Sequence, residues 1–225
     1  MKPVSYLVIS VLFILSSCTA LPTIHSDLAL KTTLCSKPFP SGQKQYVHSL
    51  VVSLPGGENS LMTGITTVSA EMRSVHVMIM TPEGLILFEG RLKEDQIEIL
   101  RSISFFSTAT FAEGLLNDVR LIFLKPAAQL TEVGRTEQGS QVCRYRHIDK
   151  SVLDVVIDMN GDWELVQYGA NSQPNRQVIA RYPTSGVRSV KNDTPDRIKL
   201  IVTGNFHYTL DMQLIQSVDV ETKHE

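Results

Sequence analysis

The sequence predicts a mainly β domain in which an antiparallel sheet curls into an incomplete barrel, with one helix in or over its mouth. Short segments in which every second residue is apolar recur along the chain and are separated by turns rich in Pro, Gly and Asn, which indicates about ten or eleven strands. Only one stretch has convincing helical periodicity. A sheet of this size must bury one face, and a half-barrel that holds the helix does so.

The first expected strands lie before the helix. They cover residues 46–54, 61–69, 72–80, 85–89 and 96–101. Within 72–80, Val75, Val77 and Ile79 alternate with polar or half-polar positions, which is typical of a half-buried strand. The next turn contains Pro82, Glu83 and Gly84, and its Pro and Gly predict a tip that protrudes from the sheet.

The expected helix covers residues 110–124. Its apolar residues recur at helical spacing along one face: Phe111, Leu115, Leu116, Val119, Ile122 and Phe123. Pro126 ends it, because proline cannot continue the hydrogen-bond ladder and disfavours helix in the preceding residue.

Strands resume after the helix. They are expected at 138–148, 152–158, 163–169, 178–182, 197–202 and 206–217. Asn160-Gly161 is the strongest hairpin signal in the chain. The surrounding residues 158–162 resemble a calcium loop only superficially, because the glycine and glutamate that such a loop needs at its sixth and twelfth positions are missing.

The N-terminal sequence is typical of a secretory signal that is followed by a lipidated cysteine. Lys2 precedes an apolar run over residues 6–15 that is too short to span a bilayer permanently. Leu15-Ser16-Ser17-Cys18 resembles the bacterial lipobox, which implies a mature chain that begins at a palmitate-bearing Cys18. Cleavage of an ordinary signal peptide at Ser17 or Ala20 is the alternative. Thr19, where aspartate would imply inner-membrane retention, favours the periplasmic face of the outer membrane of a Gram-negative cell.

These features divide the chain into a lipoprotein signal peptide (1–17), a lipidated N-terminus and tether with one helical turn near 26–34 (18–44), the half-barrel domain (45–220) and a tail (221–225). The net charge is −2 and the Lys and Arg residues are scattered, so no nucleic-acid partner is expected. Apart from Cys18, the chain has Cys35 and Cys143. In an oxidising periplasm they are candidates for a disulfide that ties the N-terminal arm to the sheet, and two reduced, partly buried thiols are the alternative.

Three stretches, in order, resemble the LolA/LolB family of lipoprotein carriers, and LolB more than LolA. Residues 77–85 resemble its strand, Pro-Gly tip and return strand. Residues 160–169 resemble its strand that contains Asn-Gly, Trp and Tyr-Gly. Residues 195–200 resemble its late proline, which is followed by alternating aliphatic residues. Residues 116–126 also resemble a related, uncharacterised family of bacterial lipoproteins. The resemblance covers residues 46–218 and implies a curled half-barrel with an apolar cavity for acyl chains.

The resemblance predicts a lipid-anchored protein that accepts a lipid or lipoprotein in such a cavity, in exchange with a periplasmic carrier protein. The expected lining residues are alternating strand residues, helix residues that close the cavity as a mobile lid, and one tryptophan: Val77, Ile79, Leu85, Leu87, Leu115, Val119, Ile122 and Trp163. The alternative is a structural or assembly lipoprotein of the outer membrane with a filled core.

Two further expectations concern chemistry. The chain has no nucleophile elbow, no phosphate loop and no histidine spacing typical of a metal site, so neither an enzyme nor a cofactor or metal is expected. In LolB an exposed leucine follows the proline of the tip and is implicated in transfer to the membrane, whereas this chain has Glu83 there. A carboxylate does not enter an anionic bilayer surface as leucine does, so the tip is expected to meet protein or solvent.

Overall fold

A computed structural model describes residues 21–27, 32–57, 59–103, 108–183, 194–204 and 207–220. The signal segment, Cys18 and the tail lie outside these ranges, so the lipidation of Cys18 stays a prediction.

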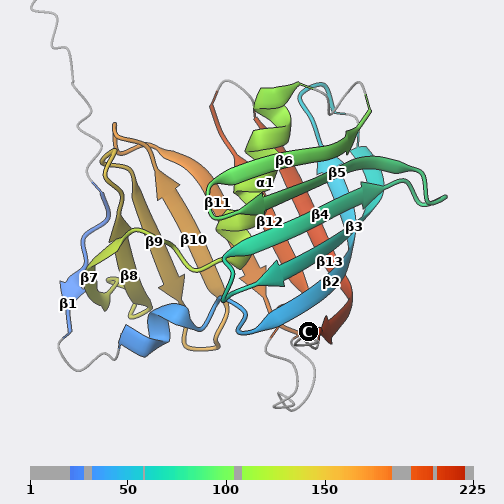
Figure 1. Cartoon of the computed structure of the whole chain (residues 1–225). Coiled ribbons are helices and arrows are strands. Elements are labelled where there is room, and N and C mark those ends of the chain that lie inside the picture. The colour runs from blue at the N-terminus through green and yellow to red at the C-terminus, as the bar shows by residue number, and fades with distance from the viewer. Residues whose placement is uncertain are drawn as a thin grey trace, which may run out of the picture.

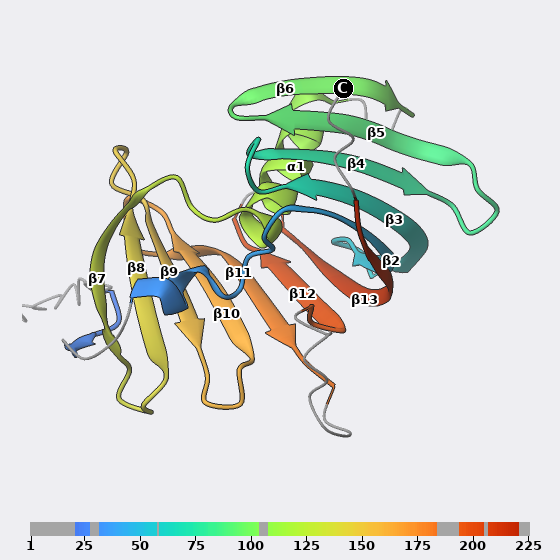
Figure 2. The same ribbon diagram turned by 60° about the horizontal axis from the view of Figure 1, so that its bottom comes forward.

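Thirteen strands form one antiparallel sheet in the order β1-β7-β8-β9-β10-β11-β12-β13-β2-β3-β4-β5-β6. Its strands are β1 (His25–Ser26), β2 (Gln43–Ser53), β3 (Asn59–Ser69), β4 (Ser74–Met80), β5 (Ile86–Lys93), β6 (Gln96–Ser102), β7 (Gln129–Arg135), β8 (Gln141–Arg146), β9 (Val152–Ile157), β10 (Trp163–Tyr168), β11 (Pro174–Arg181), β12 (Arg197–Val202) and β13 (Tyr208–Asp219). The two outer strands, β1 and β6, do not pair, and the sheet curls into an open half-barrel (Figures 1 and 2). The predicted fold class is confirmed.

Two strands were not expected from the sequence. β7 has weak alternation, with Glu132 exposed and Gly134 buried, and β1 pairs with it over only two residues. β7 owes its place to pairing on both sides, with β8 and with β1, rather than to a local pattern. The short N-terminal helix η1 (Thr32–Ser36) begins later than the expected turn.

Helix α1 (Ala109–Phe123) lies on the concave side of the half-barrel (Figure 1). It ends at Leu124, which is extended and precedes Lys125-Pro126. Leu116 packs against β5 at Gly90, where an added Cβ would lie 3.2 Å from Leu116 Cδ1 and 2.8 Å from Phe88 Cζ. The missing side chain at Gly90 therefore allows the helix to approach the sheet closely.

The same helix also bonds to the other half of the sheet through Asp118, whose side chain is only 2 % exposed. Its carboxylate accepts hydrogen bonds from Arg176 of β11 and Tyr208 of β13. Burial raises the pKa of Asp118, and the charge of Arg176 and both hydrogen bonds oppose that rise. Asp118 thus links the helix to strands on the far side of the sheet from β5.

Candidate functional site

The main cavity lies at one end of the half-barrel, and its volume is about 770 Å³. Its walls come from the segment after η1, the β7–β8 and β9–β10 turns, the last turn of α1 and the start of β12. The apolar lining residues are Leu34, Pro38, Phe39, Pro40, Tyr46, Ile122, Phe123, Ile157, Met159, Trp163, Tyr182, Pro195 and Ile198.

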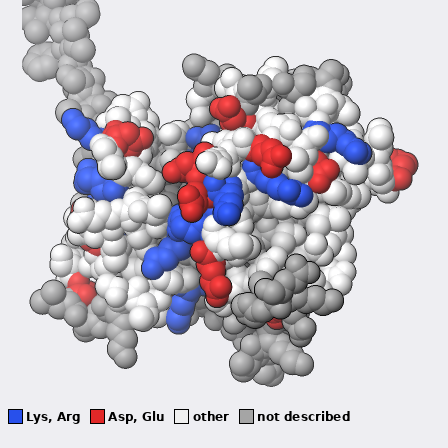
Figure 3. All heavy atoms as spheres, in the orientation of Figure 1, with Lys and Arg blue, Asp and Glu red and all other residues white. Residues whose placement is uncertain are grey.

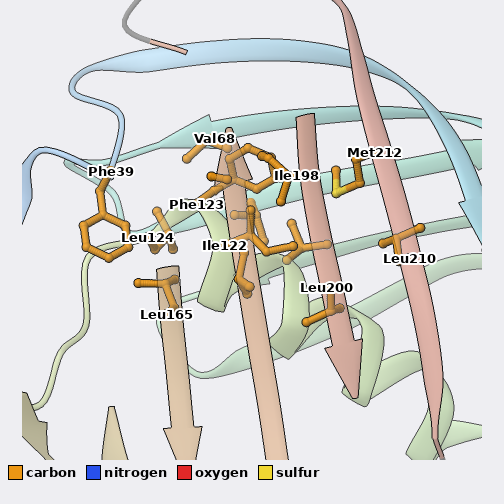
Figure 4. Packing of buried hydrophobic residues seen from close by; sticks show 14 of the residues in the cluster. Phe39, Val68, Ile122, Phe123, Leu124, Leu165, Ile198, Leu200, Leu210 and Met212 are labelled. Atoms are coloured by element: carbon orange, nitrogen blue, oxygen red, sulfur yellow. The ribbon is translucent and has the colours of Figure 1, made fainter. Parts of the chain in front are cut away.

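A disulfide holds one wall in place. Cys35 of η1 and Cys143 of β8 are bonded, with their Cα atoms 5.7 Å apart. The prolines at 38 and 40 then restrict the backbone on either side of Phe39. Phe39 is buried and points toward the cluster that contains Leu124 and Leu165 (Figure 4). This wall depends on a covalent bond and one inserted ring rather than on a strand or a long helix.

The polar groups around the cavity lie mostly at its rim. Lys44 forms an ion pair with Asp219 at 3.2 Å, and Arg135 pairs with Asp27 at 3.1 Å. Lys37 is exposed and also lines the cavity. The lining as a whole is only somewhat more apolar than polar, and it also includes Asp158, so charges of both signs surround the cavity. A mixed lining of this kind is suited to an amphipathic ligand.

Three aromatic or imidazole rings meet at the cavity wall, where Tyr46 and Phe123 line the cavity and His48 does not. Tyr46 stacks on Phe123 with ring centroids 5.1 Å apart, and His48 lies 6.0 Å from each of these two rings. Both ring nitrogens of His48 are buried and have no hydrogen-bond partner within the described part of the chain, and burial lowers the pKa of His48 to about 4. His48 is therefore held as a neutral core residue.

The predicted lining residues separate into two groups. Ile122 and Trp163 line the cavity, and the indole Nε1 of Trp163 is buried without an acceptor among the described residues. Apart from Leu85, the others do not line the cavity but belong to the filled core. Four of them are buried and one is partly buried: Val77, Ile79, Leu115 and Val119, and Leu87. The cavity therefore lies nearer the C-terminal end of α1 than the sequence suggested.

Leu85 does not line a cavity, because its side chain is 63 % exposed. It belongs to the tip, since β5 begins only at Ile86 and the register shifts between Ile79 and Met80. Pro82, Glu83 and Gly84 of the tip are exposed as well. A hydrogen bond with the Thr81 side chain lowers the pKa of Glu83.

Several lining residues are not predicted by any local pattern in the sequence. Phe39 lies in a segment without periodicity, and Ile157 and Ile198 looked like ordinary strand residues. The only available signal was the pair of prolines that flank Phe39. Among the described residues, no group of His, Cys, Asp and Glu side chains could hold a metal ion. Within the same ranges, no helix is long and apolar enough to cross a membrane.

No family model and no curated protein matches this chain. Among solved structures, a LolA superfamily protein from Nitrosomonas europaea has a TM-score of 0.55 and 11 % identity, with 84 % of this chain and 93 % of that chain covered. This chain has the LolA-type fold. A putative outer membrane lipoprotein-sorting protein domain from Vibrio parahaemolyticus has a TM-score of 0.49 and 6 % identity, over 86 % of this chain and 92 % of that one.

Proposed function

We propose that this LolA-type chain is a non-enzymatic, lipid-anchored protein of the Gram-negative envelope that binds a hydrophobic or acylated ligand. The observation that carries the proposal is the cavity of about 770 Å³, whose lining contains apolar side chains from several elements and charged groups of both signs. Binding pockets for small ligands have this size. A lipid or the acyl chains of a lipoprotein would occupy the interior, and the ligand's polar head would lie among Lys37, Lys44 and Arg135.

In this proposal Cys18 carries the anchor and a periplasmic carrier protein supplies the ligand. Cys18→Ala should abolish palmitate labelling of the full chain and block signal removal at this site. Cys35→Ala is the control for loss of a cysteine elsewhere in the chain: it breaks the Cys35–Cys143 disulfide but keeps the acceptor thiol, so it should still be labelled. Persistent labelling of the Cys18→Ala chain would contradict the anchor assignment.

Native mass spectrometry of the purified protein tests for bound acyl species. Binding of a fluorescent fatty acid to the same protein is the second readout. Ser41 lines the cavity, so Ser41→Trp should fill its mouth and reduce bound acyl species at least tenfold. Ser60→Trp adds the same ring at an exposed position that does not line the cavity and should leave binding unchanged. Absence of acyl species and of fatty-acid binding in the wild type would refute the proposal.

A structural or assembly role is the second candidate, because the half of the barrel beneath α1 is filled. Leu116 and Phe88 are fully buried there, and Asp118 bonds the helix to the sheet. If this role alone holds, the purified protein carries no lipid, and Ser41→Trp and Ser60→Trp behave alike.

A further inference from the structure

The N-terminal arm, residues 21–27, is docked on the sheet. Its carbonyl at Pro22 accepts a hydrogen bond of 2.9 Å from Arg144 Nη2, and Asp27 pairs with Arg135. Between these contacts, His25 lies opposite Arg135 on β7. Packing there is close, since a Cβ on Gly134 would collide with the His25 carbonyl oxygen.

Pro22 lies on the convex side of the sheet. Cys143 and Tyr145 belong to the concave core, so the side chain between them, Arg144, points to the opposite face. Arg144 is buried there and donates two hydrogen bonds to Asp154, at 2.7 and 2.8 Å. The chain therefore passes from the convex face at Pro22, around the β7 edge, to the concave face at Cys35 (Figure 2 shows β1 and η1 at this edge).

The direction of the arm fixes where its N-terminal continuation begins. His25 lies at the Arg135 end of β7, whereas Pro22 contacts Arg144, whose neighbour on β7 is Glu132. The β1 pairing is antiparallel and by itself runs toward the β7–β8 turn, but it ends at His25. The chain before it instead reaches the side chain of Arg144, two residues before β8 ends at Arg146 and the turn to β9 begins. Cys18 is four residues before Pro22, which an extended chain spans in at most about 14 Å.

The β8–β9 turn carries an apolar side chain among basic ones. Ile148 is fully exposed, and Arg146 and Lys150 beside it are exposed too. The acidic residue of the turn, Asp149, accepts hydrogen bonds from the backbone N–H and hydroxyl of Ser151, at 2.9 and 2.6 Å. Its carboxylate is thus engaged within the turn, while the isoleucine and the two cations project outward.

We propose that the β8–β9 turn is the membrane contact of the anchored protein. Ile148 enters the interface of the anionic bilayer that holds the Cys18 lipid, and Arg146 and Lys150 contact lipid phosphates. This inference rests on the lipid anchor in the proposed function and is independent of the ligand in the cavity. An exposed apolar residue between cations, within reach of the anchor, matches the chemistry of that surface.

The orientation has a consequence for the cavity. Asp158 and Gly161 of the β9–β10 turn line the cavity, and this turn lies at the other end of β9 from Ile148. The six residues of β9 span about 20 Å. In this orientation the cavity lies at the end of β9 that faces away from the bilayer.

The test uses full-length lipidated protein in liposomes that contain anionic lipid and brominated phosphatidylcholine. Trp163→Phe removes the only tryptophan, and Ile148→Trp or Met159→Trp then places a new one in an exposed turn at either end of β9. Bromine quenching of the Ile148→Trp form should exceed that of the Met159→Trp form at least twofold. Equal quenching, or the reverse order, overturns the proposal.

A second measurement needs no substitution. Amide hydrogen exchange of the wild type should slow at least threefold for residues 146–151 in liposomes relative to detergent, and not for residues 158–161. Ten Gly-Ser residues inserted between Thr19 and Ala20 should remove that protection, and unchanged protection would overturn the role of the short arm. The mass of the N-terminal peptide shows separately whether Cys18 carries a lipid. An unmodified Cys18 would overturn the proposed membrane contact but would leave the proposed ligand binding untouched.

Discussion

The middle and the C-terminal end of helix α1 meet parts of the molecule that are built differently. Near the middle of the helix, Leu116 packs on Phe88 and Gly90, and the space between helix and sheet is filled. At its C-terminal end, Ile122 and Phe123 border the cavity instead. There the opposite wall is the irregular segment held by the Cys35–Cys143 disulfide. We call the first part the filled region and the second part the clamped region.

This difference shows how one half-barrel can be both stable and hollow. In the filled region, regular strands and a helix bury apolar surface at roughly 25 cal/mol per Å². In the clamped region there is no such packing around the cavity, and a covalent bond restrains the wall instead.

The charged side chains on the face seen in Figure 3 are of both signs and are interspersed. That face therefore shows no patch of one sign that would indicate a second binding site besides the cavity.

The largest effect is expected from the disulfide. Replacing Cys35 and Cys143 together by Ala should lower the free energy of unfolding by about 4 kcal/mol, because the bond closes a loop with a sequence separation of 108. Urea unfolding measures this loss, and dithiothreitol should destabilise the wild type equally while leaving the double variant unchanged. A loss below about 1 kcal/mol would show that packing, not the bond, holds the clamped region.

The second prediction tests the filled region. Asp118→Ala should cost about 3 kcal/mol, because Arg176 loses its buried carboxylate partner and the helix loses its contact with β11 and β13. Asp118→Asn, which keeps the shape and one acceptor, should cost less. Equal stability of Asp118→Ala and the wild type would contradict the role of Asp118 in joining the helix to β11 and β13.

Hydrogen exchange of α1 in the wild type tests whether the helix is a mobile lid. Protection of α1 equal to that of the central strands would favour a fixed helix.

The third prediction uses pH. The pKa of His48 is about 4 in the folded chain and 6.5 as its ordinary value, so between these pH values the unfolded chain binds a proton that the folded chain does not. Stability should therefore fall by up to roughly 3 kcal/mol as the pH drops from 6.5 to 4. His48→Phe removes this contribution and keeps a ring beside Phe123. Parallel urea titrations of both forms at pH 7 and 4.5 isolate it, and identical pH profiles would contradict the assignment.

The sequence predicted the regular parts of the molecule because their signals are local. Alternation in β4 and the helical spacing around Leu116 each act within a few residues, and the resemblance placed them in a half-barrel. The clamped region depends on contacts distant in sequence. Phe39 reaches the core because Cys35 is bonded to Cys143, and Pro22 lies on β8 because Arg144 holds it. No periodicity in the sequence indicates either contact. The sequence therefore placed the cavity beside the middle of α1, whereas it lies near the C-terminal end of that helix.

The smallest effect is expected at the β4–β5 tip, which is exposed and lies on the opposite side of the molecule from β1 (Figures 1 and 2). Leu85 is already exposed there beside Glu83. Glu83→Leu would place a second apolar side chain at the tip and should raise binding of the soluble domain to liposomes roughly tenfold, whereas Glu83→Gln should change it little. Cosedimentation with liposomes measures all three forms. Equal binding would show that the tip never meets a membrane, whichever residue it carries.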